Sequence, residues 1–123
     1  MPVAQDEAHP PARGRVLFRE FQDISNGNSA IVMLRDNETI PSGCGMTITI
    51  DQRPVVVLEA GEAFSAYVTA ANHRLGTQYP ARCAGRPGSL NITTHTGRAQ
   101  HVRVRYSVTA DVFTSTGETA LAE

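Results

Sequence analysis

Short stretches in which apolar and polar residues alternate recur along the chain. The clearest are residues 46–50, 64–69 and 101–106, and turn residues such as Pro, Gly, Asp and Asn separate them from their neighbours. A period of two between such breaks predicts half-buried β-strands. Residues 30–34 form a continuous apolar run instead, which is typical of a strand at the centre of a sheet.

The same pattern extends over most of the sequence. Asn26-Gly27 favours a type I′ hairpin turn, because these two residue types accept positive φ angles. A helix over residues 59–71 is the competing prediction, but Gly61 and the alternation that follows it argue against a helix. The predicted strands cover residues 15–21, 30–34, 46–50, 55–58, 64–69, 73–79, 89–94, 101–106 and 108–113.

Two of these strands are expected to pair as a hairpin around a turn at residues 95–98. The first strand has an apolar face with Leu90 and Ile92, and the second has one with Val102 and Val104. Pairing the two strands would place these apolar side chains on one buried face.

The spacing of the strands, near ten residues, predicts the fold class. The sequence favours an all-β fold, an antiparallel β-sandwich or barrel-like arrangement of about seven to nine short strands. A chain of 123 residues fits a single domain. We expect residues 1–14 to be a flexible, disordered tail, residues 15–114 to form the domain, and residues 115–123 to be a frayed tail.

Charge and hydropathy exclude several classes of partner. The formal net charge of the chain is −1, which gives no whole-molecule field for binding nucleic acid. No apolar stretch approaches the ~20 residues that a membrane-spanning helix needs. We therefore expect no nucleic-acid partner and no transmembrane segment.

Cys44 and Cys83 are the two cysteines of the chain, and each lies in a loop with Gly or Pro neighbours. A disulfide between them would close a loop of about 40 residues and contribute roughly 4 kcal/mol on the chain-entropy model. Two free, buried thiols are the alternative, and a redox or metal role has no Cys-x-x-Cys motif behind it. The structural disulfide is the favoured interpretation, and it indicates an oxidising compartment.

The first 14 residues are polar and rich in proline and contain no apolar segment typical of a secretory signal. Either the protein is cytoplasmic, or a signal or lipid-anchor segment preceded these residues. The cysteines favour the second interpretation, which predicts a periplasmic, outer-envelope or secreted protein.

The most specific polar feature is a stripe of basic residues in the strand at residues 101–106. His101, Arg103 and Arg105 alternate along one face, and Arg98 lies in the adjoining turn. Arginine pairs well with carboxylate or phosphate, so these four residues are a candidate patch for an anion or an acidic partner. The alternative is an ordinary solvated face of a half-exposed sheet.

Two histidines offer a second candidate site. His95 falls in the predicted turn and His101 opens the next strand, so the predicted hairpin could bring the two side chains together. A metal site would need a third ligand, and no Asp, Glu or Cys neighbours the pair in sequence. Solvated histidines are the alternative, and we predict no bound metal.

Motifs for catalysis are missing from the sequence. It contains no Gly-x-Ser-x-Gly, no His-Glu-x-x-His and no glycine-rich phosphate loop that opens a helix. Its acidic residues are scattered through turns rather than paired in apolar strands, so a glycosidase-like pair is not indicated. These observations predict a protein that is not an enzyme and has no cofactor.

A family resemblance lies in the turn and strand residues from Cys44 to Tyr106. Cys44-Gly-Met-Thr-Ile-Thr-Ile-Asp-Gln-Arg-Pro-Val-Val-Val-Leu-Glu-Ala-Gly-Glu is followed by strands at 64–69 and 73–79. This stretch resembles small β-sandwich domains of unknown function in bacterial exported proteins and lipoproteins, and its pattern is similar to the PEGA-type repeat. Asp51-Gln52 stands where that pattern has Asp-Gly, and Asn72-His73 where it has Gly-His. The resemblance implies an envelope-associated or secreted bacterial protein without enzymatic activity.

These inferences lead to one functional expectation and one alternative. We expect an envelope or secreted protein that acts as a non-enzymatic binding or structural module, a monomer whose partner is an acidic protein or envelope component. The alternative is a small metal-binding protein or enzyme that uses His95 and His101.

Overall fold

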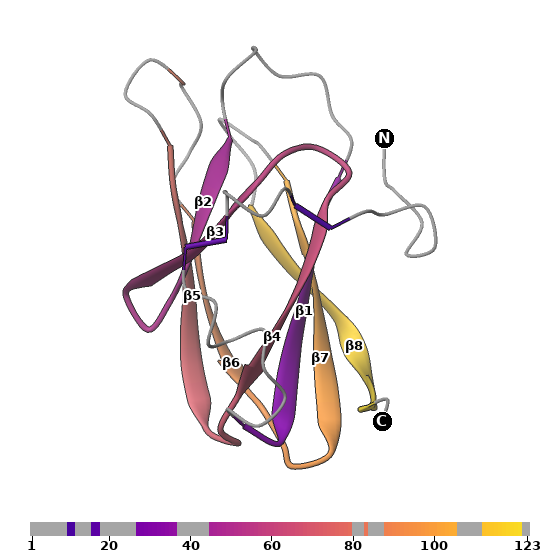
Figure 1. The fold of residues 1–123 in the computed structure, drawn as a ribbon. Helices are drawn as coiled ribbons and strands as arrows, with labels where there is room; N and C mark the ends of the chain where they lie inside the picture. The colour runs from indigo at the N-terminus through magenta and orange to yellow at the C-terminus, as the bar shows by residue number, and fades with distance from the viewer. Residues whose placement is uncertain are drawn as a thin grey trace.

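The computed structural model describes residues 10–11, 16–17, 27–36, 45–79, 83, 88–105 and 112–121. These residues form eight β-strands in two four-stranded sheets (Figure 1). No helix in the described ranges has the length and apolar character to cross a membrane. The strands are β1 (Ser29–Arg35), β2 (Met46–Ile50), β3 (Arg53–Leu58), β4 (Ala63–Val68), β5 (Asn72–Gln78), β6 (Ser89–Thr93), β7 (Arg98–Val104) and β8 (Phe113–Ala120).

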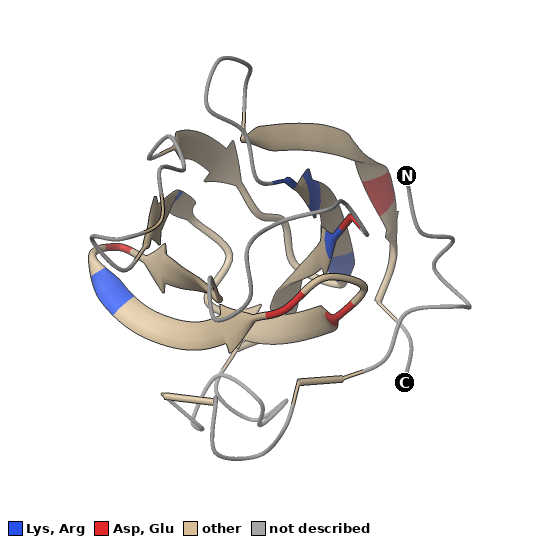
Figure 2. Ribbon diagram, turned by 90° about the horizontal axis from the view of Figure 1, so that it is seen from above, with Lys and Arg blue, Asp and Glu red and all other residues tan. Residues whose placement is uncertain are grey.

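The two sheets pack face to face. One has the strand order β3-β2-β5-β6, and the other has the order β4-β1-β7-β8. Seen along the strands, both sheets curve around a common interior (Figure 2). The prediction of an all-β, sandwich-like fold of short strands is confirmed.

The core lies between the two sheets and consists of the side chains that point inward from every second residue of the strands. In β1, Ile31 and Met33 are fully buried, and β2 contributes Met46, Ile48 and Ile50. Since side chains alternate between the two faces of a strand, the alternation seen in the sequence places these residues in the interior. The core is completed by Val16, Val55, Val56, Leu58, Phe64, Ala66, Val68, Leu75, Ile92, Val102, Val104, Val112 and Phe113.

The predicted hairpin between residues 89–94 and 101–106 is wrong. The turn exists, with Arg98 N donating to His95 O (3.0 Å) and Gly97 at a φ of 75°. However, it carries the chain from β6 in one sheet to β7 in the other, where β7 pairs parallel with β1. The apolar faces of β6 and β7 therefore both contribute to the interior, as the alternation indicates, but from opposite sheets.

The end of the chain also differs from the prediction. Residues 113–120 form β8, which pairs antiparallel with β7, where the sequence predicts a frayed tail from residue 115 on. Of the predicted edge strand at 108–113, the structure describes only Val112 and Phe113. After Phe113 every residue of β8 is exposed. A strand with both faces in solvent carries no period-two signal, so this one could not be found from alternation.

Near the N-terminus, two predictions fall mostly outside the described residues. Of the predicted strand at 15–21, the structure describes Val16, which bridges to Val56, and Leu17. Asn26 of the predicted type I′ turn lies outside the described residues, so that turn stays a prediction. A side chain at Gly27 would collide with the backbone of Val68, and close approach is the reason for glycine here.

The β2–β3 hairpin has a two-residue loop with an unusual sequence. Asp51 and Gln52 have φ angles of 52° and 71°, the conformation of a type I′ turn. Residues with a side chain are strained in this region.

Replacing Gln52 with glycine should therefore stabilise the protein. We expect Gln52→Gly to raise the free energy of unfolding by about 0.5–1 kcal/mol, because the strain at positive φ is removed. Denaturant unfolding followed by circular dichroism measures the change. As a matched control, Gln78→Gly in β5 should destabilise by a similar amount, and equal losses in both variants would contradict the argument.

Candidate functional site

The outward face of the sheet β4-β1-β7-β8 has an apolar floor. The outward residues of the central strand β1 are Ala30, Val32 and Leu34, and Ala30 and Leu34 are only 1% and 3% exposed. An outer sheet face of a small domain is normally polar. This face is therefore the unusual surface of the molecule.

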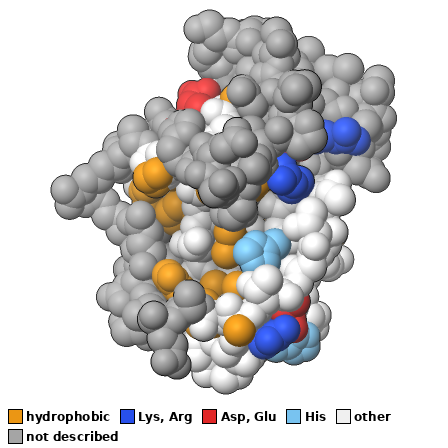
Figure 3. Space-filling view, turned by 90° about the vertical axis from the view of Figure 1, so that its right-hand side faces the viewer, with side chains coloured by type: hydrophobic (Ala, Val, Ile, Leu, Met, Phe, Trp, Pro, Cys, Tyr) orange, Lys and Arg blue, Asp and Glu red, His pale blue; other side chains and the backbone are white. Residues whose placement is uncertain are grey.

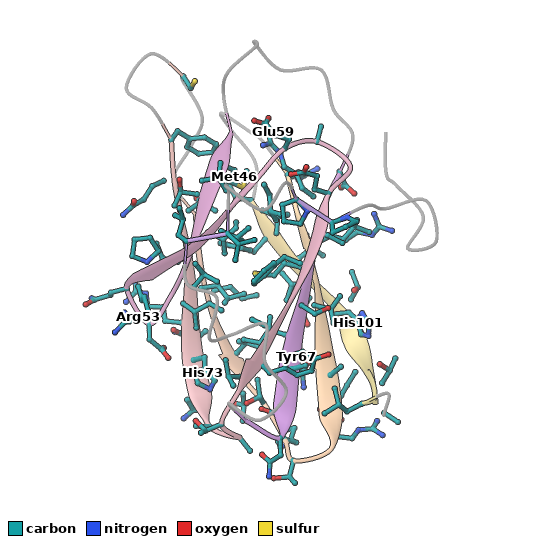
Figure 4. The ribbon with its side chains drawn as sticks, viewed as in Figure 1. Met46, Arg53, Glu59, Tyr67, His73 and His101 are labelled. Atoms are coloured by element: carbon teal, nitrogen blue, oxygen red, sulfur yellow. The ribbon has the colours of Figure 1, made fainter. Side chains whose placement is uncertain are left out.

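Strand register places other side chains beside this floor. Val32 lies between Ser65 of β4 and His101 of β7, and Ala30 lies next to Tyr67 of β4. Tyr67 and His101 thus stand on either side of β1 (Figure 4).

Two adjoining hollows open on this face. Their volumes are about 260 and 170 Å³, and they share Val32, His101 and Thr119. Apolar side chains gather beside a histidine on this side of the molecule (Figure 3). We name this site the outer groove, and its residues are Ala30, Val32, Leu34, Tyr67, His101, Arg103 and Thr119.

The polar groups of the outer groove are partly engaged. His101 Nε2 lies 2.8 Å from Thr119 Oγ1. Arg103 Nη1 donates to Asp36 Oδ1 (2.6 Å), and both side chains are less than one-third exposed. Arg103 is therefore neutralised locally, and its charge is available to a partner only in competition with Asp36.

The structure divides the predicted basic patch between two faces. His101 and Arg103 line the outer groove, and Arg105 is exposed just beyond the end of β7. Arg98 lies on the opposite face of β7, the one that it shares with Gln100. Its side chain pairs with Glu118 (2.9 Å), whose carboxylate also accepts a hydrogen bond from Gln100. An anion or partner patch at His101, Arg103 and Arg105 stays a prediction, and Arg98 is not on that face.

The two histidines of the alternative prediction also point to different faces. His95 Nε2 lies 3.9 Å from Glu118 Oε2, whereas His101 contacts Thr119. Adjacent residues of a strand have opposite orientations, so His95 and His101 lie on opposite sides of β8. Within the described part of the chain, no group of three or more His, Cys, Asp or Glu residues could hold a metal ion.

One of the two cysteines is described. Cys83 is buried, with 6% exposure, and its sulfur is not a free thiol. Cys44 lies outside the described residues. The disulfide between Cys44 and Cys83 therefore stays a prediction.

A second polar site, which the sequence did not indicate, centres on His73. The ring is 9% exposed and bridges two loops (Figure 4). Its Nδ1 lies 2.7 Å from Asp51 Oδ2, and its Nε2 lies 2.8 Å from Thr69 O. Asp51 also accepts from Arg74 N (2.9 Å). The site joins the β2–β3 turn to the segment between β4 and β5.

Both ring nitrogens of His73 therefore have an acceptor within hydrogen-bond distance, a carboxylate at Nδ1 and a backbone carbonyl at Nε2. Partial burial by itself would raise the pKa of Asp51. The hydrogen bond from His73, the bond from Arg74 N and the charge of His73 outweigh burial and hold the pKa of Asp51 below its ordinary value of 3.8.

A hydroxyl network next to His73 ties the two sheets together. Ser29 Oγ of β1 donates to Val68 O (2.7 Å) and lies 3.0 Å from Thr94 Oγ1. Thr94 also lies within hydrogen-bond distance of Thr69 O and of Ala71 N. Both Ser29 and Thr94 are buried, so these bonds satisfy polar groups that would otherwise be costly in the interior.

His101 and Arg103 are candidates from the sequence that line the outer groove, whereas the sequence analysis did not indicate the apolar floor of the groove. The signal for the floor is the continuous apolar run at 30–34. Every second residue of this run, Ala30, Val32 and Leu34, faces away from the core and forms the floor of the groove. His73 and Asp51 are 22 residues apart, and no local pattern connects them.

Comparison with known proteins assigns no family. A scan against protein-family models, a search of curated proteins and a search of solved structures each found no match to this chain. What stands is the architecture itself, an all-β domain of two four-stranded sheets.

The Asp51–His73 pair predicts a pH dependence of stability. Because the pKa of Asp51 is lower in the folded than in the unfolded state, its contribution is complete above about pH 5 and is lost as the pH falls through the folded-state pKa. We expect Asp51→Asn to cost about 1 kcal/mol at pH 6, after allowance for the half-exposed carboxylate. The cost should disappear near pH 2.

Unfolding curves at both pH values measure this difference. Asn72→Ala serves as the control, since Asn72 is exposed and its side-chain oxygen accepts from Thr93 rather than contacting Asp51. A cost for Asp51→Asn that is equal at both pH values would show that the carboxylate charge does not matter.

Proposed function

We propose that this chain is a non-enzymatic binding module of a bacterial envelope or secreted protein, and that its binding site is the outer groove. The partner is an extended segment that presents both apolar and acidic side chains. The observation that carries this proposal is the apolar, hollowed outer face of β1 at Ala30, Val32 and Leu34.

The hollow supports binding through its shape and lining. An apolar floor with a few polar groups at its edge is typical of recognition sites. His101 supplies a hydrogen-bonding ring at the centre of the groove, and Tyr67 adds an aromatic side chain at one wall. Burial of apolar partner groups on this floor would supply most of the binding free energy.

Charge supports an acidic partner. Arg103 and Arg105 follow His101 at alternate positions of β7 and just beyond its end, so basic side chains border the groove. Such groups contribute mainly to orientation and to the rate of association.

The resemblance to exported β-sandwich domains and the buried, non-free Cys83 support an envelope or secreted location. A disulfide between Cys44 and Cys83 would suit that oxidising environment.

An NMR titration tests the binding site. The probe is a synthetic eight-residue peptide that alternates glutamate and valine. We expect shift changes at Val32, Tyr67 and His101, and Arg105→Glu should weaken binding about fivefold through like-charge repulsion. Arg74→Glu, on the exposed face of β5 in the other sheet, is the matched control and should bind as the unmodified protein does. Shifts that avoid the outer groove would refute this assignment.

Mass spectrometry tests the disulfide. The natively purified protein, treated with iodoacetamide under denaturing conditions without reductant, should gain no adduct, and after reduction it should gain one on each of Cys44 and Cys83. Adducts before reduction would mean that the thiols are free, and the argument for an oxidising compartment would then be lost.

A further inference from the structure

Strand β8 is an open edge of the sheet β4-β1-β7-β8. It pairs with β7 on one side, and none of the eight described strands pairs with its other side (Figure 1). The residues from Thr114 to Ala120 are all exposed. Natural edge strands are usually protected by lysine, proline, short length or a β-bulge. Strand β8 has eight residues without lysine or proline, and its one such device is the register shift near its centre.

The hydrogen-bond pattern between β7 and β8 shows which main-chain N–H and C=O groups of β8 do not bond to β7 and are available to a further strand. Leu121 N donates to Gly97 O, and Arg105 N donates to Val112 O. In an antiparallel ladder, hydrogen-bonded residue pairs alternate with non-hydrogen-bonded pairs. The two bonds from Leu121 N and Arg105 N lie next to non-hydrogen-bonded pairs, whose own N–H and C=O groups point away from the partner strand.

These non-hydrogen-bonded pairs are Arg98–Ala120 at one end and Val104–Phe113 at the other. By alternation within each half of the strand, the outward main-chain groups belong to Phe113, Ser115, Glu118 and Ala120. A register shift between His101 and Val102 separates the two halves and leaves Thr116 as the extra residue of a β-bulge.

This set of outward groups is complementary to itself. A two-fold axis between Thr116 and Gly117 would place Ser115 opposite Glu118 of a second copy, and Phe113 opposite Ala120 of a second copy. Every outward N–H and C=O would then meet an outward group. The bulge residues would face each other at the centre, where Gly117, with a φ of 133°, has no side chain to obstruct the approach.

Charge also permits this pairing. Glu118 is the one charged residue of β8, and Arg98 and Gln100 of the same chain already bind its carboxylate. In the two-fold register each Glu118 faces a serine, so no like charges lie directly opposite.

We propose that two copies of this chain associate through antiparallel pairing of their β8 strands, which joins two four-stranded sheets into one continuous sheet. The partner is a second copy because a strand related by a two-fold axis satisfies all the outward groups without a like-charge contact. Closed two-fold pairing is also the commonest symmetry of protein oligomers. The interface is a single strand edge, so the dimer is a weak one.

Sedimentation equilibrium on the full chain, at concentrations up to about 0.5 mM, tests the association, as a small interface calls for high concentration. The unmodified protein should show a monomer–dimer equilibrium. Ser115→Pro should abolish the dimer, because it removes an outward N–H that β7 does not use. Ser115→Ala keeps that N–H and should dimerise normally. A protein that stays monomeric throughout would overturn the proposal.

A pair of charge variants tests the register independently of whether the proline variant folds. Ser115→Glu places a second carboxylate opposite Glu118 of the other copy and should weaken association about fivefold, since the contact occurs twice in the dimer. Ser115→Arg should strengthen association by a similar factor, and both effects should shrink in high salt. Effects of the same sign in both variants would overturn the proposed register.

Discussion

The structure depends on a strand that is apolar on both faces. In β1, Ile31 and Met33 point into the sandwich, and Ala30 and Leu34 point away from it, yet all four are almost fully buried. The inward pair, Ile31 and Met33, packs in the core between the two sheets. The outward pair lies on a strand that β4 and β7 flank on both sides. The core and the outer groove are thus two consequences of one sequence run.

The charges of the molecule are arranged so that they do not dominate the groove. Asp36 compensates Arg103, and Glu118 compensates Arg98 on the other face. Ion pairs at such partly exposed positions contribute little stability, but they lower the attraction of the surface for unspecific anions. A partner of the groove must therefore gain affinity from apolar contact around Val32, with charge serving orientation.

Local and distant constraints explain what the sequence could reveal. In β4 and β6 buried residues alternate with more exposed ones, so the apolar–polar alternation of the sequence located these strands nearly to the residue. The parallel pairing of β1 with β7 depends on contacts between segments that are about 70 residues apart, which no local pattern encodes. Strand β8 was missed because solvent on both faces of Thr114–Ala120 removes the constraint that produces alternation. The same holds for His73, whose partner Asp51 is distant in sequence.

The exposed β8 strand and the outer groove are connected by geometry. A two-fold axis at the centre of an antiparallel strand pair runs perpendicular to the sheet, so it leaves equivalent faces on the same side. Two chains joined at β8 would therefore present both outer grooves, each with its own His101, in the same direction. A partner with two suitable segments would then bind both at once, and its second attachment would occur at high effective concentration. A weak groove and a weak edge contact would in this way reinforce each other.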